Sequence, residues 1–243
     1  MSFSYETQLM AIAIALYIFD SSLLLYANEG VLIAGPKGKW HAIQGSDEFM
    51  LMGRSLYVTN LLAPHQPAFR LVWMFDEPNE KAPSTEWPDW AGKLRSVAPF
   101  TIGAGAALYV LLPLGLFTRL GTPVVFAAVA ALYLNIILAL CWLYPQRSAI
   151  HLRGKQFAAL VFECIACPPF AVNLVRRVSL AQTISEQFPV AAQRLLDADD
   201  WADVRTRCAP RIDDEIDAEP EGSQRAQALR AQRRRFQSSE IGV

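Results

Sequence analysis

Four long apolar runs dominate the pattern of hydrophobic and polar positions along the chain. They cover residues 9–26, 97–117, 124–144 and 157–175, and Asn135 is a notable polar position inside the third run. A helix that crosses a bilayer needs about 20 mostly apolar residues. The pattern therefore predicts an integral membrane protein of the all-α class, a bundle of three to four transmembrane helices.

The segments between these runs differ in character. Short runs of β-forming residues separated by Gly and Pro follow the first run and predict a small β-rich extramembrane insertion. After the fourth run the chain becomes polar, which predicts a helical and partly disordered C-terminal tail. The predicted organisation is a first transmembrane helix at 1–27, the β-rich insertion at 28–75, a Pro-rich linker at 76–96, a transmembrane hairpin at 97–144, a basic loop at 145–156, a fourth membrane segment at 157–177 and the tail at 178–243.

Composition agrees with a membrane protein. The chain is 53% hydrophobic and 19% charged, with a net charge of −1, and its mean hydropathy of +0.21 is high for a soluble domain. The arginine run of the tail lacks the interleaved aromatic residues of a nucleic-acid surface. We therefore expect the bilayer and other membrane proteins, or further copies of the chain, as partners, and no nucleic acid. Arg233, Arg234 and Arg235 are candidate contacts to lipid headgroups.

The distribution of Lys and Arg predicts an orientation in a bacterial inner membrane. No basic residue precedes the first run, so the positive-inside rule places the N-terminus in the periplasm and residues 28–96 in the cytoplasm. A fourth complete crossing would then export the arginines of the tail. A segment that dips in and returns at Pro168 and Pro169 avoids this conflict, and a kinked complete crossing is the alternative.

Polar residues inside the apolar runs are the candidate functional positions. Asp20 and Glu163 are the acids of these runs, and Asn135 and Asn173 are amides within or beside them. If the two carboxylates lie at one depth, they could share a proton as in a proton-linked carrier or oligomeric channel. The alternative is that these groups form hydrogen bonds that specify helix packing.

The fourth run also contains a Cys-x-x-Cys pair, Cys164 and Cys167. The layout is similar to that of the vitamin K epoxide reductase family, which also has few membrane helices, a long connection after the first helix and a Cys-x-x-Cys pair in the fourth helix. The resemblance implies a membrane thiol–quinone oxidoreductase with Cys164 and Cys167 as its catalytic pair. Members of that family carry a second cysteine pair in the long connection, whereas residues 28–96 contain no cysteine. The alternative is that both cysteines fill a tight helix contact.

No complete catalytic set appears in the sequence. A phosphate-binding glycine loop and an H-E-x-x-H motif are missing, and His41, His65 and His151 are scattered through loops. One cysteine pair alone does not make a zinc motif, so we expect no metal and no cofactor. The leading hypothesis is a non-enzymatic scaffold, assembly or accessory subunit of a membrane complex.

Overall fold

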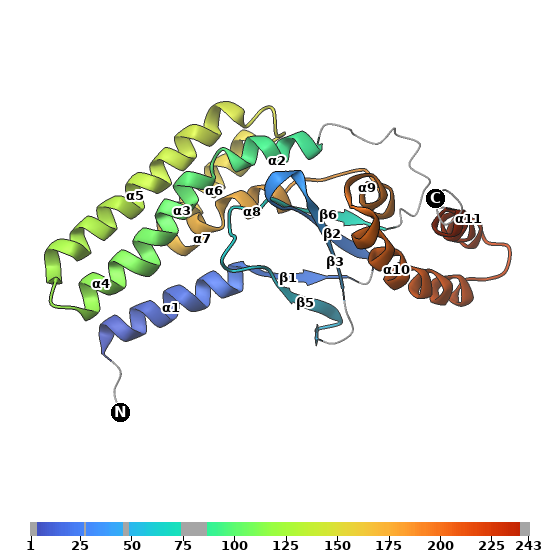
Figure 1. Ribbon diagram of the computed structural model, residues 1–243, viewed down its shortest axis with the longest axis horizontal. Helices are drawn as coiled ribbons and strands as arrows, with labels where there is room; N and C mark the ends of the chain where they lie inside the picture. Colours follow the sequence, from blue (N-terminus) through green and yellow to red (C-terminus); the bar gives the residue numbers. More distant parts are fainter. Residues whose placement is uncertain (1–3, 27, 46–48, 74–86, 239–243) are drawn as a thin grey trace.

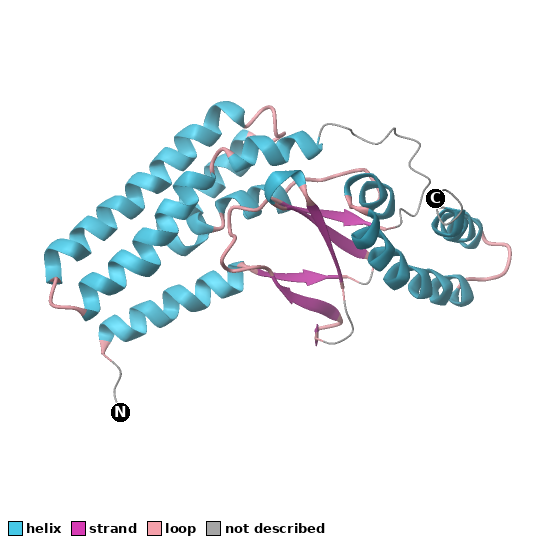
Figure 2. Cartoon of the chain, viewed as in Figure 1, coloured by secondary structure: helices cyan, strands magenta, loops and turns pink. Residues whose placement is uncertain are grey.

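The computed structural model describes residues 4–26, 28–45, 49–73 and 87–238. These residues form a helical bundle beside a body in which two small antiparallel sheets are flanked by helices (Figures 1 and 2). Among them, two helices are long and apolar enough to cross a membrane. The prediction of an all-α bundle with three to four transmembrane helices is therefore wrong.

We call α1 and α3–α7 the bundle, and the sheets with α2 and α8–α11 the body. The bundle comprises α1 (Tyr5–Asp20), α3 (Ala98–Ala106), the π-helical turn η2 (Ala107–Leu111), α4 (Leu112–Phe117), α5 (Gly121–Gln146), α6 (Gly154–Ala166) and α7 (Pro168–Val172). The strands are β1 (Ser22–Leu25), β2 (Glu29–Ala34), β3 (Trp40–Gln44), β4 (Met50–Leu51), β5 (Arg54–Val58) and β6 (Ala68–Val72), with the short 3-10 turn η1 (Pro36–Gly38). The remaining helices are α2 (Trp87–Arg95), α8 (Leu174–Leu180), α9 (Phe188–Leu195), α10 (Ala198–Ala218) and α11 (Gln224–Ser238).

The first apolar run changes from helix to strand. Helix α1 ends at Asp20, where Ser22 Oγ donates to the Ile18 carbonyl at 2.8 Å, and short polar side chains of this kind compete with helical backbone bonds. The run then continues as β1, which pairs with β5. The 16 residues of α1 reach about 24 Å at helical rise, less than the apolar thickness of about 30 Å.

The fourth apolar run is broken near its middle. Helix α6 ends after 13 residues, and Cys167 adopts φ −134° and ψ 84° before α7 begins at Pro168. Proline lacks the N–H that would continue the helix and forces the preceding residue out of the α region. Helix α8 then packs against β6, so the chain goes from the bundle back to the body.

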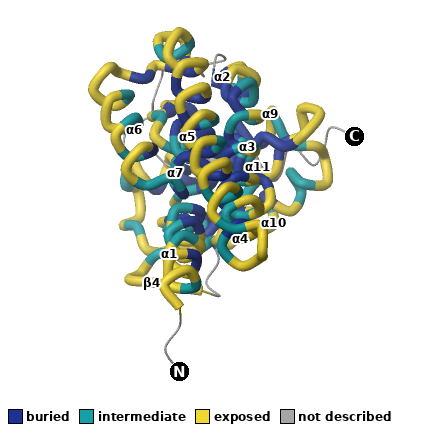
Figure 3. The backbone as a smooth tube through the Cα atoms, turned by 90° about the vertical axis from the view of Figure 1, so that its left-hand side faces the viewer, coloured by how far each residue is buried: buried dark blue, intermediate teal, exposed yellow. Residues whose placement is uncertain are grey.

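The hairpin of α3, α4 and α5 contains the two membrane-length helices, Ala98–Phe117 and Gly121–Gln146. A Cβ added at Gly103 would lie 2.3 Å from Asn135 Oδ1, so this glycine permits the close approach of α3 to α5. Figure 3 shows that α5 and α6 alternate between buried and exposed turns. The outward-facing turns carry large apolar side chains.

The sheets form two layers of the body. Their strand orders are β1-β5-β4 and β3-β2-β6. The central strand β2 is apolar on both faces: Leu32 faces the main core, and Val31 packs with Leu23 and Leu25 of the other sheet. On the main-core face, the rings of Trp40, Phe69 and Trp87 lie 5.0–6.0 Å from one another. A continuous apolar run such as β2 fits a strand covered on both sides.

The C-terminal tail completes the body. Helix α9 packs on β2, α10 packs on β3, and α11 pairs with α10. A Cβ at Gly30 of β2 would meet the Phe188 ring at 2.4 Å, which fixes how closely α9 approaches the sheet. Of the predicted linker at 76–96, the part up to residue 86 lies outside the described residues, and Trp87 begins α2.

Candidate functional site

The predicted polar positions meet where α1, α6 and α8 join. Asp20 ends α1, Glu163 lies on α6, and Arg177 of α8 forms an ion pair with each carboxylate through a different guanidinium nitrogen. The Arg177 Cζ also lies 4.5 Å from the centre of the Phe170 ring. The two acids therefore come together around a shared cation, which lies between them.

Buried hydrogen bonds surround these ion pairs. Arg176 is 2% exposed, and its Nη2 donates to the carbonyls of Asn60 and Ala63 at 3.1 and 3.0 Å. Asn173 is fully buried, accepts from Arg176 Nη1 at 3.3 Å and donates to Ser21 Oγ at 2.9 Å. We call this cluster the polar junction; its side chains are Asp20, Ser21, Glu163, Asn173, Arg176 and Arg177.

The polar junction connects the bundle to the body. Its acids lie on bundle helices, both arginines lie on α8, and Arg176 also binds the loop that follows β5. Arg177 pairs with both carboxylates, whereas Arg176 donates to Asn173 and to two backbone carbonyls. The side chain of Asp20 is 9% exposed and that of Glu163 is 42% exposed, so losing the cation is costly mainly at Asp20.

The remaining intramembrane candidate lies elsewhere. Asn135 is on α5, where its Nδ2 donates to the Ala131 carbonyl of its own helix at 2.8 Å. Within the part of the chain that the structure describes, it makes no hydrogen bond to the polar junction. Its side chain packs against Gly103, so its role is in the contact between α3 and α5.

The cysteine pair lies beside the polar junction, with one thiol buried and the other partly exposed. Cys164 is fully buried in α6, and Cys167 lies at the break before Pro168, so the helix does not continue through the pair. Both thiols are free. Exchange with a thiol or reaction with a quinone requires access to the sulfur, and Cys164 has none in this conformation.

The arginines proposed to contact lipid headgroups lie on α11, at the end of the molecule away from the α4–α5 turn (Figure 1). Arg233 pairs with Asp213 of α10 at 2.8 Å, and Arg234 Nε donates to the Arg230 carbonyl at 3.4 Å. The side chain of Arg235 lies outside the described residues. Acidic residues of α10 thus partly neutralise this basic helix, and lipid contact by it stays a prediction.

Sequence reasoning found the acids and missed their partner. Arg176 and Arg177 follow the fourth apolar run, and sequence reasoning used these arginines only to predict membrane orientation. The sequence did contain a signal for this pairing, because two acids inside apolar runs can be matched with two consecutive arginines at the end of the fourth run. The described residues contain no group of three His, Cys, Asp or Glu side chains that could hold a metal ion.

Comparison of the chain with protein family models, with curated proteins and with solved structures gives no match. The likeness in layout to the vitamin K epoxide reductases therefore gains no support from relatives. Any functional conclusion has to come from the geometry of this chain.

Proposed function

We propose that the protein is a membrane-anchored, non-catalytic scaffold or accessory subunit whose body carries its binding surfaces. The observation that carries this proposal is the apolar surface of the bundle. Phe19, Phe126 and Phe162, on three different helices, are exposed by 75%, 71% and 73%. Many large exposed apolar side chains on neighbouring helices are unusual for a soluble monomer and are stable when lipid covers them.

The dimensions of the hairpin agree with a bilayer. Helix α5 has 26 residues and reaches about 39 Å, and the 20 residues from Ala98 to Phe117 reach about 30 Å. The shorter helix matches an apolar core of about 30 Å, and α5 is long enough to cross it and reach the headgroup region. The half-exposed aromatic residues Trp142 and Tyr144, near the end of α5, have the chemistry of a membrane–water interface.

The return of the chain at Cys167 supports a topology in which the fourth segment does not cross. Helix α6 follows α5 after a short loop, and α8 rejoins the body, so the tail and the sheets belong on one side of the bilayer. The basic residues near that side are Lys93, Arg95, Arg147, Arg153 and Lys155, whereas the hairpin turn has Arg119. By the positive-inside rule the body is cytoplasmic, in a bacterial inner membrane.

The polar junction favours an anchoring role over catalysis or transport. A proton carrier needs a carboxylate that gains and loses a proton during its cycle, whereas Arg177 engages both acids here. A thiol oxidoreductase needs an accessible sulfur, and Cys164 is buried. Neither alternative has an observation of its own in its favour.

Membrane extraction tests the proposal. The full chain should stay in the membrane pellet after alkaline carbonate treatment. Leu134→Arg puts a charge on the exposed face of α5 near its centre, at a cost of about 2.5–3.5 kcal/mol in a membrane helix, and should shift protein to the soluble or degraded fraction. Thr206→Arg on α10 is the matched control, because it adds the same charge to an exposed position of the body. Complete extraction of the unaltered protein would refute an integral anchor.

Labelling of introduced cysteines tests the topology. Arg119→Cys at the hairpin turn and Lys39→Cys or Ala228→Cys in the body should react with a membrane-impermeant maleimide from opposite sides of the bilayer. Cys141→Ser and Cys167→Ser remove the less buried native thiols from the background. Reaction of Lys39→Cys and Ala228→Cys from different sides would show a fourth crossing.

A further inference from the structure

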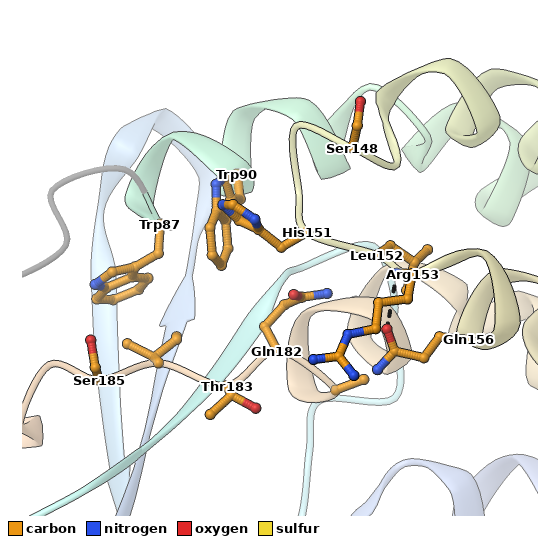
Figure 4. A pocket seen from close by; sticks show the side chains of 12 residues that line it. Trp87, Trp90, Ser148, His151, Leu152, Arg153, Gln156, Gln182, Thr183 and Ser185 are labelled. Atoms are coloured by element: carbon orange, nitrogen blue, oxygen red, sulfur yellow. Dashed lines mark hydrogen bonds between the residues drawn. The ribbon is translucent and has the colours of Figure 1, made fainter.

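A polar pocket of about 680 Å³ lies where the bundle meets the body. Its walls come from α2, from the loop after α5, from the first residues of α6 and from the loop after α8 (Figure 4). The volume is within the range of about 300–1,000 Å³ that is usual for small-molecule sites. The pocket shares no residue with the polar junction.

The polar side chains of the pocket are rich in hydrogen-bond donors. The Arg153 guanidinium points into the space between Gln156, Gln182 and Thr183 (Figure 4). Among the described residues no carboxylate lines the pocket, and Arg153 makes no ion pair with any of them. A guanidinium surrounded by amides and hydroxyls is suited to an anion with several acceptor oxygens, above all phosphate.

The acid that directly follows the α8 loop of the pocket is engaged elsewhere. Glu186 follows the pocket residue Ser185, but it is 3% exposed and pairs with Arg194 at 2.8 Å. It also accepts a hydrogen bond of 2.5 Å from Trp87 Nε1. Its charge is therefore balanced inside the body and does not oppose an anion beside Arg153.

The other walls are apolar and lie close to the ends of the membrane-length helices. Trp90, Leu152 and Ile184 are nearly buried lining residues, and the His151 ring packs edge-on against Trp90 at 5.2 Å. Ser148 follows the end of α5 by two residues. A site with this position and with both polar and apolar walls fits a ligand at the depth of lipid headgroups.

We propose that this pocket binds a phosphate group, supplied by the headgroup of an anionic phospholipid, with Arg153 as its principal charged contact. The choice of a lipid as the source rests on the proposed membrane anchor, whereas the phosphate chemistry rests on the pocket alone. Free phosphate is the other source of the same chemistry. The experiment therefore has one arm for each.

In the lipid arm, purified full-length protein in a neutral detergent is titrated with dioleoyl phosphatidylglycerol or dioleoyl phosphatidylcholine. Native mass spectrometry counts the bound lipid. We expect a preferred first equivalent of phosphatidylglycerol and about tenfold weaker binding in Arg153→Gln, because a charge-assisted hydrogen bond is lost. In the second arm, inorganic phosphate replaces the lipid, and the fluorescence of the lining tryptophans reports binding.

Lys155→Gln is the matched control, since it removes the same charge two residues away at an exposed position that does not line the pocket. It should change phosphatidylglycerol affinity less than about twofold, because general attraction to the anionic surface falls only slightly. Arg153→Lys keeps the charge and should restore part of the binding, which separates loss of the site from loss of folding.

The outcomes separate this proposal from the membrane anchor. Arg153-dependent binding of phosphatidylglycerol alone assigns the site to lipid, and Arg153-dependent binding of inorganic phosphate assigns it to a free anion. If Arg153→Gln and Lys155→Gln weaken binding equally in both arms, the proposal that the pocket binds phosphate is wrong. If carbonate extracts the protein while Arg153-dependent phosphate binding persists, the anchor fails and the pocket stands.

Discussion

The bundle and the body differ in how far their phenylalanine side chains are exposed. Phe188 and Phe69 of the body are fully buried, whereas Phe126 and Phe162 of the bundle are more than 70% exposed. A single apolar core nevertheless runs through both regions, from Leu132 of α5 to the tail. The regions therefore fold as one unit but are built for different surroundings.

The difference shows how the two regions are stabilised. In the body, apolar side chains leave water by packing on each other, at a gain of about 25 cal/mol per Å² buried. In the bundle, large apolar side chains also lie on the outer surface. Burial of apolar area therefore contributes less there, and close packing and polar contacts hold the helices together. Phenylalanine substitutions in the two regions should then have very different effects.

Truncating one phenylalanine in each region gives the largest expected contrast. Phe188→Ala removes a fully buried ring that stacks near Trp73 at 6.2 Å and covers Gly30, and it should cost about 3–5 kcal/mol of unfolding free energy. Phe126→Ala removes a ring that is 71% exposed and should cost less than about 0.5 kcal/mol in detergent. Denaturant unfolding followed by circular dichroism measures both. Equal costs would mean that Phe126 is covered by protein, for example by a second copy.

Breaking the connection between the regions should have the next largest effect. Arg177→Met leaves Asp20, whose side chain is 9% exposed, without its cation, and Glu163 loses the same partner. We expect a loss of about 3 kcal/mol, since an unpaired buried charge is expensive while the more exposed Glu163 can regain water. Thermal unfolding in detergent measures the loss.

Two variants control this experiment. Arg207→Met breaks an exposed pair with Asp203 on α10 and should cost less than about 0.5 kcal/mol. Adding Asp20→Asn to Arg177→Met should recover part of the stability, because the uncompensated charge is gone. A double variant no more stable than Arg177→Met would show that packing of the arginine on Phe170, rather than its charge, is what matters.

The sequence predicted the apolar hairpin better than the ends of the other apolar runs. The runs at 97–117 and 124–144 do form long helices, and neither contains a charged residue. The run at 9–26 becomes a strand after Asp20, and hydropathy alone does not distinguish an apolar strand from an apolar helix. The run at 9–26 was therefore wrongly predicted to be a transmembrane helix. The run at 157–175 was the second such error, because it breaks at Cys167 before the prolines.

Contacts between distant segments could not be predicted from the sequence. The tail was predicted as a separate helical and partly disordered region, yet Phe188 fills the space above Gly30, 158 positions earlier in the chain. The polar junction also depends on contacts between distant segments, because its ion pairs form only when α8 takes the direction that it does after Pro168. Residue types identified Asp20 and Glu163 as unusual, but only the fold supplied Arg177 as their partner.

A third prediction tests how the bundle is packed. Gly103→Ala would put a Cβ 2.3 Å from Asn135 Oδ1 and 2.8 Å from its Cγ, so the Asn135 side chain must move. We expect a loss of about 1–3 kcal/mol, the usual cost of overpacking. Gly105→Ala, two residues along the same helix, meets only Val172 Cγ1 at 3.4 Å and should be neutral or slightly stabilising. If both variants unfold alike, close approach at Gly103 is not what holds the hairpin.

The smallest expected effect is a difference in labelling between two cysteines, with no change in stability. Cys208 of α10 is buried by protein, and burial raises the pKa of its thiol from 9.0 to about 12, so at neutral pH it is protonated and shielded. Cys141 of α5 is exposed in the structure. In a bilayer, lipid should cover it if the bundle is the membrane anchor.

A water-soluble maleimide should therefore label neither cysteine in native vesicles, but for different reasons. Urea at a concentration that unfolds the body should expose Cys208 and leave Cys141 protected, because the bilayer remains intact. Transfer of the folded protein to a short-chain detergent should favour Cys141 instead. Peptide mass spectrometry reads the two sites separately. Rapid labelling of Cys141 in intact vesicles would mean that this face of α5 meets water, and the contrast between the two regions would then have to come from a protein partner rather than from lipid.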